Sequence, residues 1–310
     1  MLLSNHVNAA GTFIVLFCIA CCLILSLQAK AASDSPVVIT ISKQDKVTAS
    51  QNIYFHQLLK AIMDITQTTH GSYRIETTSD VIPQERAVLM LAKRHRINLV
   101  WTMTSEKREN TLLPIRIPLL KGLLGYRIFI IKKSNLEKFA AIQSADQLKA
   151  LLAGQGKGWP DTDILRNNGF KVLTSPSYQS LFNMLEANRF DYFPRGIHEP
   201  WGELKQTGRT NLVVEPNLIL HYPAPLYFFV AKEDQLLHQR INTGLELLIQ
   251  QGIFDQLFYA QESVKQALTK TNIPNRKRIT LDNKNLSELT PIHRRELWLT
   301  PEDPELKLYP

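Results

Sequence analysis

Residues 189–204, RFDYFPRGIHEPWGEL, predict a buried strand that ends at Pro194 and leaves one guanidinium, Arg195, at its tip. A guanidinium is planar and always charged, so it can donate two parallel hydrogen bonds to a carboxylate. Arg195 is therefore a candidate for binding an anionic or carbonyl-rich group of a ligand. The alternative is that Arg195 pairs with Glu199 or Asp191 and only holds its loop in place.

Residues that would indicate an enzyme are not arranged in catalytic patterns. The eight histidines are dispersed, and the sequence contains no His-Glu-x-x-His run, no Gly-x-Ser-x-Gly elbow and no phosphate-binding loop. His198 and Glu199 could form an acid–base pair, but neighbours in sequence seldom converge on one atom. We expect no catalytic residue, no metal site and no cofactor, so the sequence argues against an enzyme.

The N-terminus predicts export. Residues 12–27, TFIVLFCIACCLILSL, are almost wholly apolar but fall short of the roughly 18–20 residues that span a bilayer. Small residues follow at Ala29 and Ala31, in the spacing that a signal peptidase reads. We expect residues 1–31 to be a cleaved signal peptide and the mature chain to be periplasmic. The three cysteines all lie in this segment, so disulfides and thiolate chemistry would be absent from the mature chain.

The positive charge is concentrated in one segment. The formal net charge is +8, and residues 85–138 carry twelve Lys and Arg against four Glu, which accounts for the whole excess. Such a segment can attract nucleic acid, an anionic membrane surface or an anionic small ligand, or it can simply be a solvated face. Export, and the spread of these basic residues over several predicted elements, argue against nucleic acid as the binding partner.

The chain after the signal alternates strands and helices, which predicts an α/β fold with mostly parallel strands. Two units of this kind are followed by a return strand, two closing helices and a polar C-terminal stretch. The expected strands are 37–42, 73–79, 97–103, 126–133, 171–175 and 225–232, and the expected helices include 84–95, 144–154, 233–250 and about 253–267.

This order of elements resembles the type II periplasmic solute-binding proteins, especially the family 3 receptors of amino-acid importers. Three stretches carry the likeness: LAKRHRINLVWTMTSEKRENTLLPIRIPLL, SYQSLFNMLEANRFDYF and PLYFFVAKEDQLLHQRINTGLELLIQQGIFDQLF. They are similar to the family's Thr-x-x-Arg segment before the crossover, to a helix and strand of its second lobe, and to its return strand with the terminal helices. The resemblance covers roughly residues 36–266.

The resemblance implies an α/β, two-lobe periplasmic-binding-protein fold (type II), with two mixed sheets flanked by helices and joined by two crossing hinge strands. We expect lobe I at 36–124 plus 226–268, lobe II at 125–225, and a polar C-terminal tail at 269–310. A ligand would be trapped between the lobes, because ligands of open α/β sheets bind beyond the carboxyl ends of the strands and hinge closure excludes water.

The Thr-x-x-Arg motif implies where the ligand's carboxylate would bind. In the family, this arginine grips the α-carboxylate of the ligand. Here the stretch starts at Thr104, the residue at matching spacing is Lys107, and the chemically matching residue is Arg108. We expect Thr104 and Arg108 to contact the ligand, because only a guanidinium recognises a carboxylate with two parallel bonds; a surface arginine is the alternative reading. Amino-acid receptors of this family usually place an acid where this chain has Arg195, so we expect a ligand with an anionic group.

Aromatic side chains are candidates for the walls of the cleft. Tyr54 lies near the start of the first helix, Trp101 near the carboxyl end of a strand, and Trp159 in the turn GKGWPDTD. These rings could sandwich a ligand while Asp161 and Thr162 supply hydrogen bonds at a helix N-terminus. The alternative for each ring is a place in the core.

These observations lead to three hypotheses. The first is a monomeric periplasmic solute-binding protein that captures a small polar, possibly anionic, ligand for import by an inner-membrane permease of the ABC-transporter class. The second is a ligand sensor or partner-binding module of the same fold without a transport role. The third is a periplasmic enzyme on this scaffold.

Overall fold

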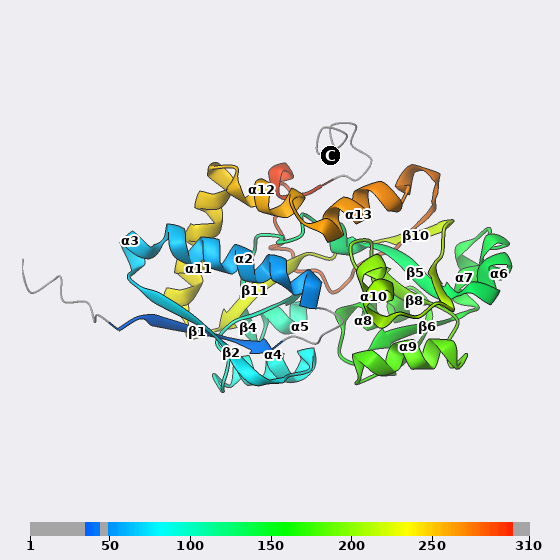
Figure 1. Ribbon diagram of the computed structural model, residues 1–310, viewed down its shortest axis with the longest axis horizontal. Coiled ribbons are helices and arrows are strands. Elements are labelled where there is room, and N and C mark those ends of the chain that lie inside the picture. Colours follow the sequence, from blue (N-terminus) through cyan, green and yellow to red (C-terminus); the bar gives the residue numbers. More distant parts are fainter. Residues whose placement is uncertain (1–34, 44–48, 300–310) are drawn as a thin grey trace, which may run out of the picture.

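The computed structural model describes residues 35–43 and 49–299 of the chain. The predicted signal peptide, residues 1–31, lies outside them. The described elements form two groups side by side along the longest axis of the molecule (Figure 1). We call residues 37–115 with 226–259 the first half, and residues 126–221 the second half.

The first half contains a parallel strand pair and a three-stranded antiparallel sheet. The pair is β1–β2, and the sheet has the order β3–β11–β4. Asn98 joins them: its side chain accepts from the amide of Thr40 at 2.8 Å and donates to the carbonyl of Val38 at 2.7 Å. The elements of this half are β1 (Val37–Lys43), α2 (Ala49–Ile65), α3 (Gln67–His70), β2 (Tyr73–Val81), α4 (Gln84–Ala92), β3 (Val100–Met103), α5 (Glu106–Glu109), β4 (Leu112–Ile115), β11 (Leu226–Ala231), α11 (Gln235–Gln250) and α12 (Ile253–Tyr259).

The second half is built around β5, whose residues 126–131 are all buried. This strand pairs with β8, β9 and β10, and β12 extends the same sheet beyond β10. A second, parallel pair, β6–β7, adjoins it through the amide of Gly154, which donates to the carbonyl of Tyr192 at 2.9 Å. The elements are β5 (Tyr126–Lys132), α6 (Leu136–Ala140), α7 (Ala145–Lys149), β6 (Leu152–Gly156), α8 (Pro160–Asn167), β7 (Lys171–Ser175), α9 (Tyr178–Glu186), β8 (Phe193–Gly196), α10 (Pro200–Thr207), β9 (Leu212–Val214) and β10 (Leu218–His221); α13 (Glu262–Lys270) and β12 (Lys277–Thr280) follow later in the chain.

Two predicted helices differ from the structure. The helix expected at 144–154 ends at Lys149, and the residues from Leu152 form β6, because their hydrogen bonds go to β7 rather than along the chain. The helix expected at about 253–267 is divided into α12 and α13. Short apolar runs fit either a helix or a strand, so their partners decide between the two.

The stretch expected to be a polar tail, 269–310, is folded throughout its described part. Its residues 271–299, here the C-terminal segment, contain β12, which pairs in parallel with β10. Arg276 is buried and donates to the carbonyls of Glu215 at 2.6 Å and Leu218 at 2.9 Å. The sequence missed this strand because three of its four side chains are polar, whereas its backbone hydrogen bonds to β10 hold it in the sheet.

The C-terminal segment then continues to the first half. Asn285 accepts at its carbonyl from the amide of Glu106 at 2.9 Å, and Arg294 pairs with Glu246 of α11 at 2.6 Å. The amide of Leu299 donates to the carbonyl of Lys121, which lies in the connection between the halves. This segment therefore touches both halves and a connection between them.

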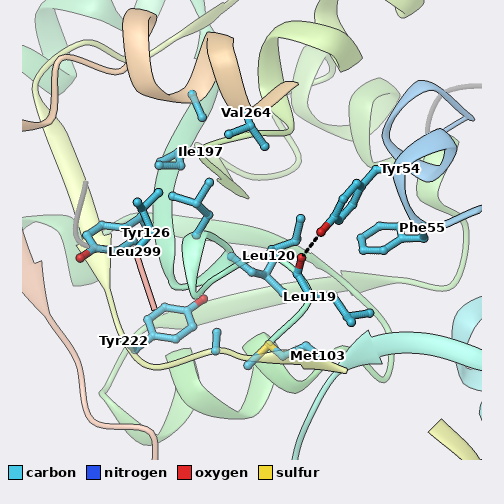
Figure 2. Packing of buried hydrophobic residues seen from close by; sticks show 14 of the residues in the cluster. Tyr54, Phe55, Met103, Leu119, Leu120, Tyr126, Ile197, Tyr222, Val264 and Leu299 are labelled. Carbon is cyan, nitrogen blue, oxygen red and sulfur yellow. Dashed lines mark hydrogen bonds between the residues drawn. The ribbon is translucent and has the colours of Figure 1, made fainter. Parts of the chain in front are cut away.

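The core is continuous between the halves. Figure 2 shows Tyr54 of α2, Tyr126 of β5 and Leu299 of the C-terminal segment within one cluster of buried side chains. The connection 116–125 supplies Leu119 and Leu120, which are 0% and 4% exposed. Burial of this kind stabilises the junction between the halves through the hydrophobic effect. The predicted lobe boundaries, 36–124 with 226–268 and 125–225, remain predictions.

Candidate functional site

A cavity of 640 Å³ is lined by residues of both halves. The first half contributes β3, the end of β2 and the first turns of α4, and the second half contributes the β6–α8 turn, the β7–α9 turn and the residues that follow Pro194 in β8. These second-half residues lie at the carboxyl ends of their strands, which is where α/β folds bind ligands. Four of the eight predicted ligand-binding residues line the cavity, namely Trp101, Trp159, Asp161 and Arg195.

Arg195 is held by two carboxylates. Its Nε donates to Glu203 Oε2 at 3.0 Å, and its Nη2 lies 2.6 Å from Glu203 Oε1 and 2.8 Å from Glu199 Oε1. Burial alone would lower the pKa of Arg195, but the two carboxylates raise it well above its usual value. The structure thus contains the ion pair with Glu199 that was the alternative reading of Arg195, together with a second pair to Glu203 that the sequence analysis missed.

Aromatic rings surround the same guanidinium. The Cζ of Arg195 lies 4.9 Å from the ring centre of Phe193, 5.1 Å from that of Trp159 and 5.4 Å from that of Tyr178. Such cation–π contacts are strong when the cation is desolvated. Gly156 makes room for the Trp159 ring, because a Cβ at this position would lie 2.2 Å from it.

A second buried ion pair lies beside the first. Arg127 of β5 contacts Asp161 at 2.6 Å, and the hydroxyl of Tyr222 donates to the same Asp161 oxygen at 2.6 Å. Arg127 Nη1 also lies 3.7 Å from Glu199, which links the two pairs into one network. Arg127 was not among the predicted site residues, although a charged residue inside the apolar strand YRIFIIKK was a signal that could have identified it.

His198 lies near both of these cations. It is 7% exposed and lines the cavity, and its Nδ1 is buried and has no hydrogen-bond partner among the described residues. Burial, together with the nearby Arg127 and Arg195, lowers the pKa of His198 to about 3. The imidazole is therefore neutral at physiological pH, so it can donate or accept a hydrogen bond without bringing charge to the wall.

Arg108 is buried and its donors are used within the protein. Nη1 donates to Thr102 Oγ1 at 2.6 Å and to the carbonyl of Met103 at 2.7 Å. Nη2 donates to Gln84 Oε1 at 3.0 Å and to the carbonyl of Gly158 at 3.1 Å. Burial lowers the pKa of Arg108 to about 10. Because Gly158 belongs to the second half, Arg108 ties the β6–α8 turn to the first half, and it is not among the residues that line the cavity.

The remaining predicted contacts lie away from the cavity. Tyr54 points into the core, where its hydroxyl donates to the carbonyl of Leu119 at 2.7 Å (Figure 2). Thr104 is buried and donates to Glu109 Oε1 at 2.6 Å. Thr162 is buried and its hydroxyl faces the carbonyl of Gly156 at 3.3 Å. For these three side chains the structure shows contacts within the protein only.

Aromatic and apolar side chains form the first-half wall. Trp101 stacks on Phe55 with ring centres 5.5 Å apart, and its indole nitrogen donates to Asn52 at 2.8 Å. The buried side chains of Ile82, Leu99 and Met103 continue this surface. Phe55 was missed because its position on α2 reads as an ordinary core position, and only the tertiary fold brings it beside β3.

The described residues contain no cluster of His, Cys, Asp or Glu that could hold a metal ion. Within the same residues, none of the helices has the length and apolar character needed to span a bilayer.

No protein-family model and no curated protein matches the chain. Solved structures do match. An ancestral arginine-binding protein bound to arginine is 18% identical, covers 74% of this chain and 99% of its own, and has a TM-score of 0.54. An arginine-specific periplasmic binding protein of Salmonella typhimurium is 16% identical, covers 71% and 97%, and has a TM-score of 0.56.

A histidine kinase sensor domain with similarity to periplasmic binding proteins is 15% identical, covers 73% of this chain and 96% of its own, and has a TM-score of 0.53. These neighbours are binding proteins or a sensor domain rather than enzymes. At these identities the comparisons establish the architecture, so the chain has the fold of the type II periplasmic binding proteins.

Proposed function

We propose that this protein is an exported solute-binding protein that captures a small organic solute in the 640 Å³ cavity. The observation that carries the proposal is the cavity itself, because it is lined by both halves and lies at the carboxyl ends of strands. Its volume is within the range of about 300–1,000 Å³ that ligand pockets have. Aromatic rings on both sides, Trp101 and Trp159, would enclose a flat ligand.

Lobe closure would trap the solute. In this proposal the halves correspond to lobe I and lobe II, and the ligand is bound more tightly by the closed arrangement, as any ligand-driven closure requires. The bond from Arg108 to the carbonyl of Gly158 would contribute to closure, because it crosses from one half to the other.

The proposed site of action is the periplasm, with delivery to an inner-membrane permease. The short apolar run at 12–27 and the small residues after it support export. Several neighbours are substrate-binding proteins of amino-acid ABC transporters, which makes import the first candidate for the role of this chain.

A sensor or partner-binding module is the second candidate. One neighbour is a sensor domain, and each match covers nearly all of its own chain but under three quarters of this one. The C-terminal segment, which contacts both halves, would provide a surface for a partner that a simple receptor does not need. Genes for a permease and an ATPase beside this gene would favour transport, and a membrane-bound kinase that co-purifies would favour sensing.

Native mass spectrometry tests the proposal. Protein purified gently from the cell envelope should carry a non-covalent small molecule, and adding that molecule to stripped protein should raise the melting temperature and reduce the radius of gyration. Protein that carries no ligand, and that no compound of a periplasmic metabolite extract stabilises, would contradict the proposed function.

A further inference from the structure

The buried charges beside the cavity balance one another. Three guanidiniums, Arg108, Arg127 and Arg195, and three carboxylates, Asp161, Glu199 and Glu203, are all 9% exposed or less. Asp161 is held by Arg127, and both glutamates are held by Arg195. The remaining charge of Arg108 faces four neutral acceptors from the protein. Among the described residues, each buried charge that lines the cavity is thus already paired with an opposite charge, although the Nε of Arg127 has no hydrogen-bond partner there.

The charged lining residues outside this buried group lie at the exposed edge of the cavity. Lys43, Glu85, Arg86 and Lys157 line it, and all four are exposed. Exposed charges contribute little to binding because water and salt screen them. Three of them are cations and one is an anion, and screening by water and salt keeps their selection for either sign weak.

The uncharged part of the wall combines aromatic and apolar side chains with neutral polar ones such as Asn52, Gln84 and Thr102. Phe55, Trp101, Trp159 and Tyr178 contribute rings, and buried aliphatic side chains such as Leu99 extend the surface. A flat apolar body would bury its area against these rings at about 25 cal/mol per Å². One neutral polar ring of this wall is that of His198, which lines the cavity and whose Nδ1 is buried without a hydrogen-bond partner among the described residues.

We infer that the cavity binds an uncharged small molecule with a flat, aromatic or similarly apolar body and one hydrogen-bonding end directed at His198. The inference rests on the proposed function and gives its ligand a chemical class. An ionised carboxylate or ammonium would lose its hydration on entering and would gain no free counter-ion, which is the unfavourable case for a buried charge. The amino-acid ligands of the structural neighbours belong to that disfavoured class.

A matched series of indoles tests the charge selectivity. Indole-3-propionamide is uncharged, indole-3-propionate is an anion, tryptamine is a cation and tryptophan is a zwitterion, and all share one ring. Calorimetry on the full chain in about 0.15 M salt should give the amide a Kd at least about tenfold lower than each of the other three. A charged member that binds as tightly as the amide would overturn the inference, and so would failure of all four to bind.

Variants of Asp161 and His198 test the roles of these two residues. Asp161→Asn removes the nearer carboxylate of Arg127, so the preference for the amide over indole-3-propionate should fall by about tenfold or reverse. The matched control Glu85→Gln removes an exposed carboxylate of the same cavity and should leave the preference unchanged. His198→Phe should weaken amide binding about tenfold, whereas His198→Gln, which keeps a polar group, should retain part of it. Equal shifts in Asp161→Asn and Glu85→Gln would count against the buried-charge argument; if Asp161→Asn does not fold, the wild-type series decides.

The native mass-spectrometry experiment separates this inference from the proposed function. A co-purifying neutral aromatic molecule would support both. A co-purifying amino acid, phosphate ester or carboxylate would support solute binding and overturn the uncharged-ligand inference. Absence of any ligand, with no stabilisation by the metabolite extract or by the indoles, would overturn both.

Discussion

Arg195 and Glu203 form a bidentate pair beneath the cavity: Nε lies 3.0 Å from Oε2 and Nη2 lies 2.6 Å from Oε1. Glu203 is fully buried on α10, and the hydroxyl of Tyr178 also donates to it. The guanidinium that the sequence offers as a ligand anchor is thus held by two buried carboxylates of the protein. Its removal would take this guanidinium away from two buried carboxylates, Glu199 and Glu203.

Arg195→Ala should therefore destabilise the protein. Breaking a buried ion pair from one side costs about 3–5 kcal/mol in the free energy of unfolding. Urea unfolding followed by tryptophan fluorescence measures this change. Arg74→Ala is the control, since its side chain is 62% exposed and pairs with Glu76, and it should change the free energy by no more than about 0.5 kcal/mol.

A double-mutant cycle makes this prediction more specific. Glu203→Gln and Arg195→Ala remove the same pair from opposite sides, so their effects should be non-additive, with a coupling energy of about 1–3 kcal/mol. Strictly additive effects would show that the two side chains act independently.

Arg108 should limit the local opening of the β6–α8 turn. Arg108→Lys supplies a point charge that cannot reach Thr102, Met103, Gln84 and Gly158 together, so the tie across the halves should be lost. Hydrogen exchange of the amides at 157–159 should accelerate by about tenfold or more, whereas amides of β11 should not change. Lys107→Ala, at the exposed neighbouring position, is the control. Unchanged exchange at 157–159 in Arg108→Lys would show that this bond does not hold the turn.

His198 should make stability depend on pH. Its folded pKa, about 3, lies below the usual value near 6.5, so the unfolded chain takes up a proton that the folded chain refuses. The contribution of His198 is complete above about pH 6.5 and is lost as the pH falls toward 3, with a slope of at most about 1.4 kcal/mol per pH unit. Melting curves of the wild type and His198→Gln between pH 7 and 4 should converge as the pH falls. Parallel curves would mean that another group, such as His56 or His221, accounts for the loss.

Gly122 should be intolerant of a side chain for two separable reasons. Its φ is +80°, and a Cβ would lie 2.7 Å from the Trp298 ring of the C-terminal segment. Gly122→Ala should destabilise the protein by about 1–3 kcal/mol more than Gly208→Ala, whose φ is +63° but whose surroundings are open. Trp298→Leu should relieve the steric part of the cost in a double variant. Equal costs at the two glycines would show that the C-terminal segment does not pack closely on this connection.

The alternation of strands and helices could be predicted from the sequence because it depends on local pattern. The buried strand β1 and the helix α11 follow from β-branched runs and helical spacing, and the order of units led to the fold that the solved structures share. Where the local pattern fits either a helix or a strand, the prediction was wrong. Residues 152–154 were predicted to be helical, but they pair with β7 as a strand.

The site depended far more on tertiary structure. The sequence determined that Arg108, Arg195, Trp101 and Trp159 lie at strand ends and turns, where ligand contacts are expected. It did not determine which charges are free, because Glu203 reaches Arg195 only through the fold of β8 against α10, and Asp161 reaches Arg127 across 34 positions of the chain. Charges interact over a few ångströms of space rather than along the sequence, and only the packed chain decided that these guanidiniums are neutralised within the protein.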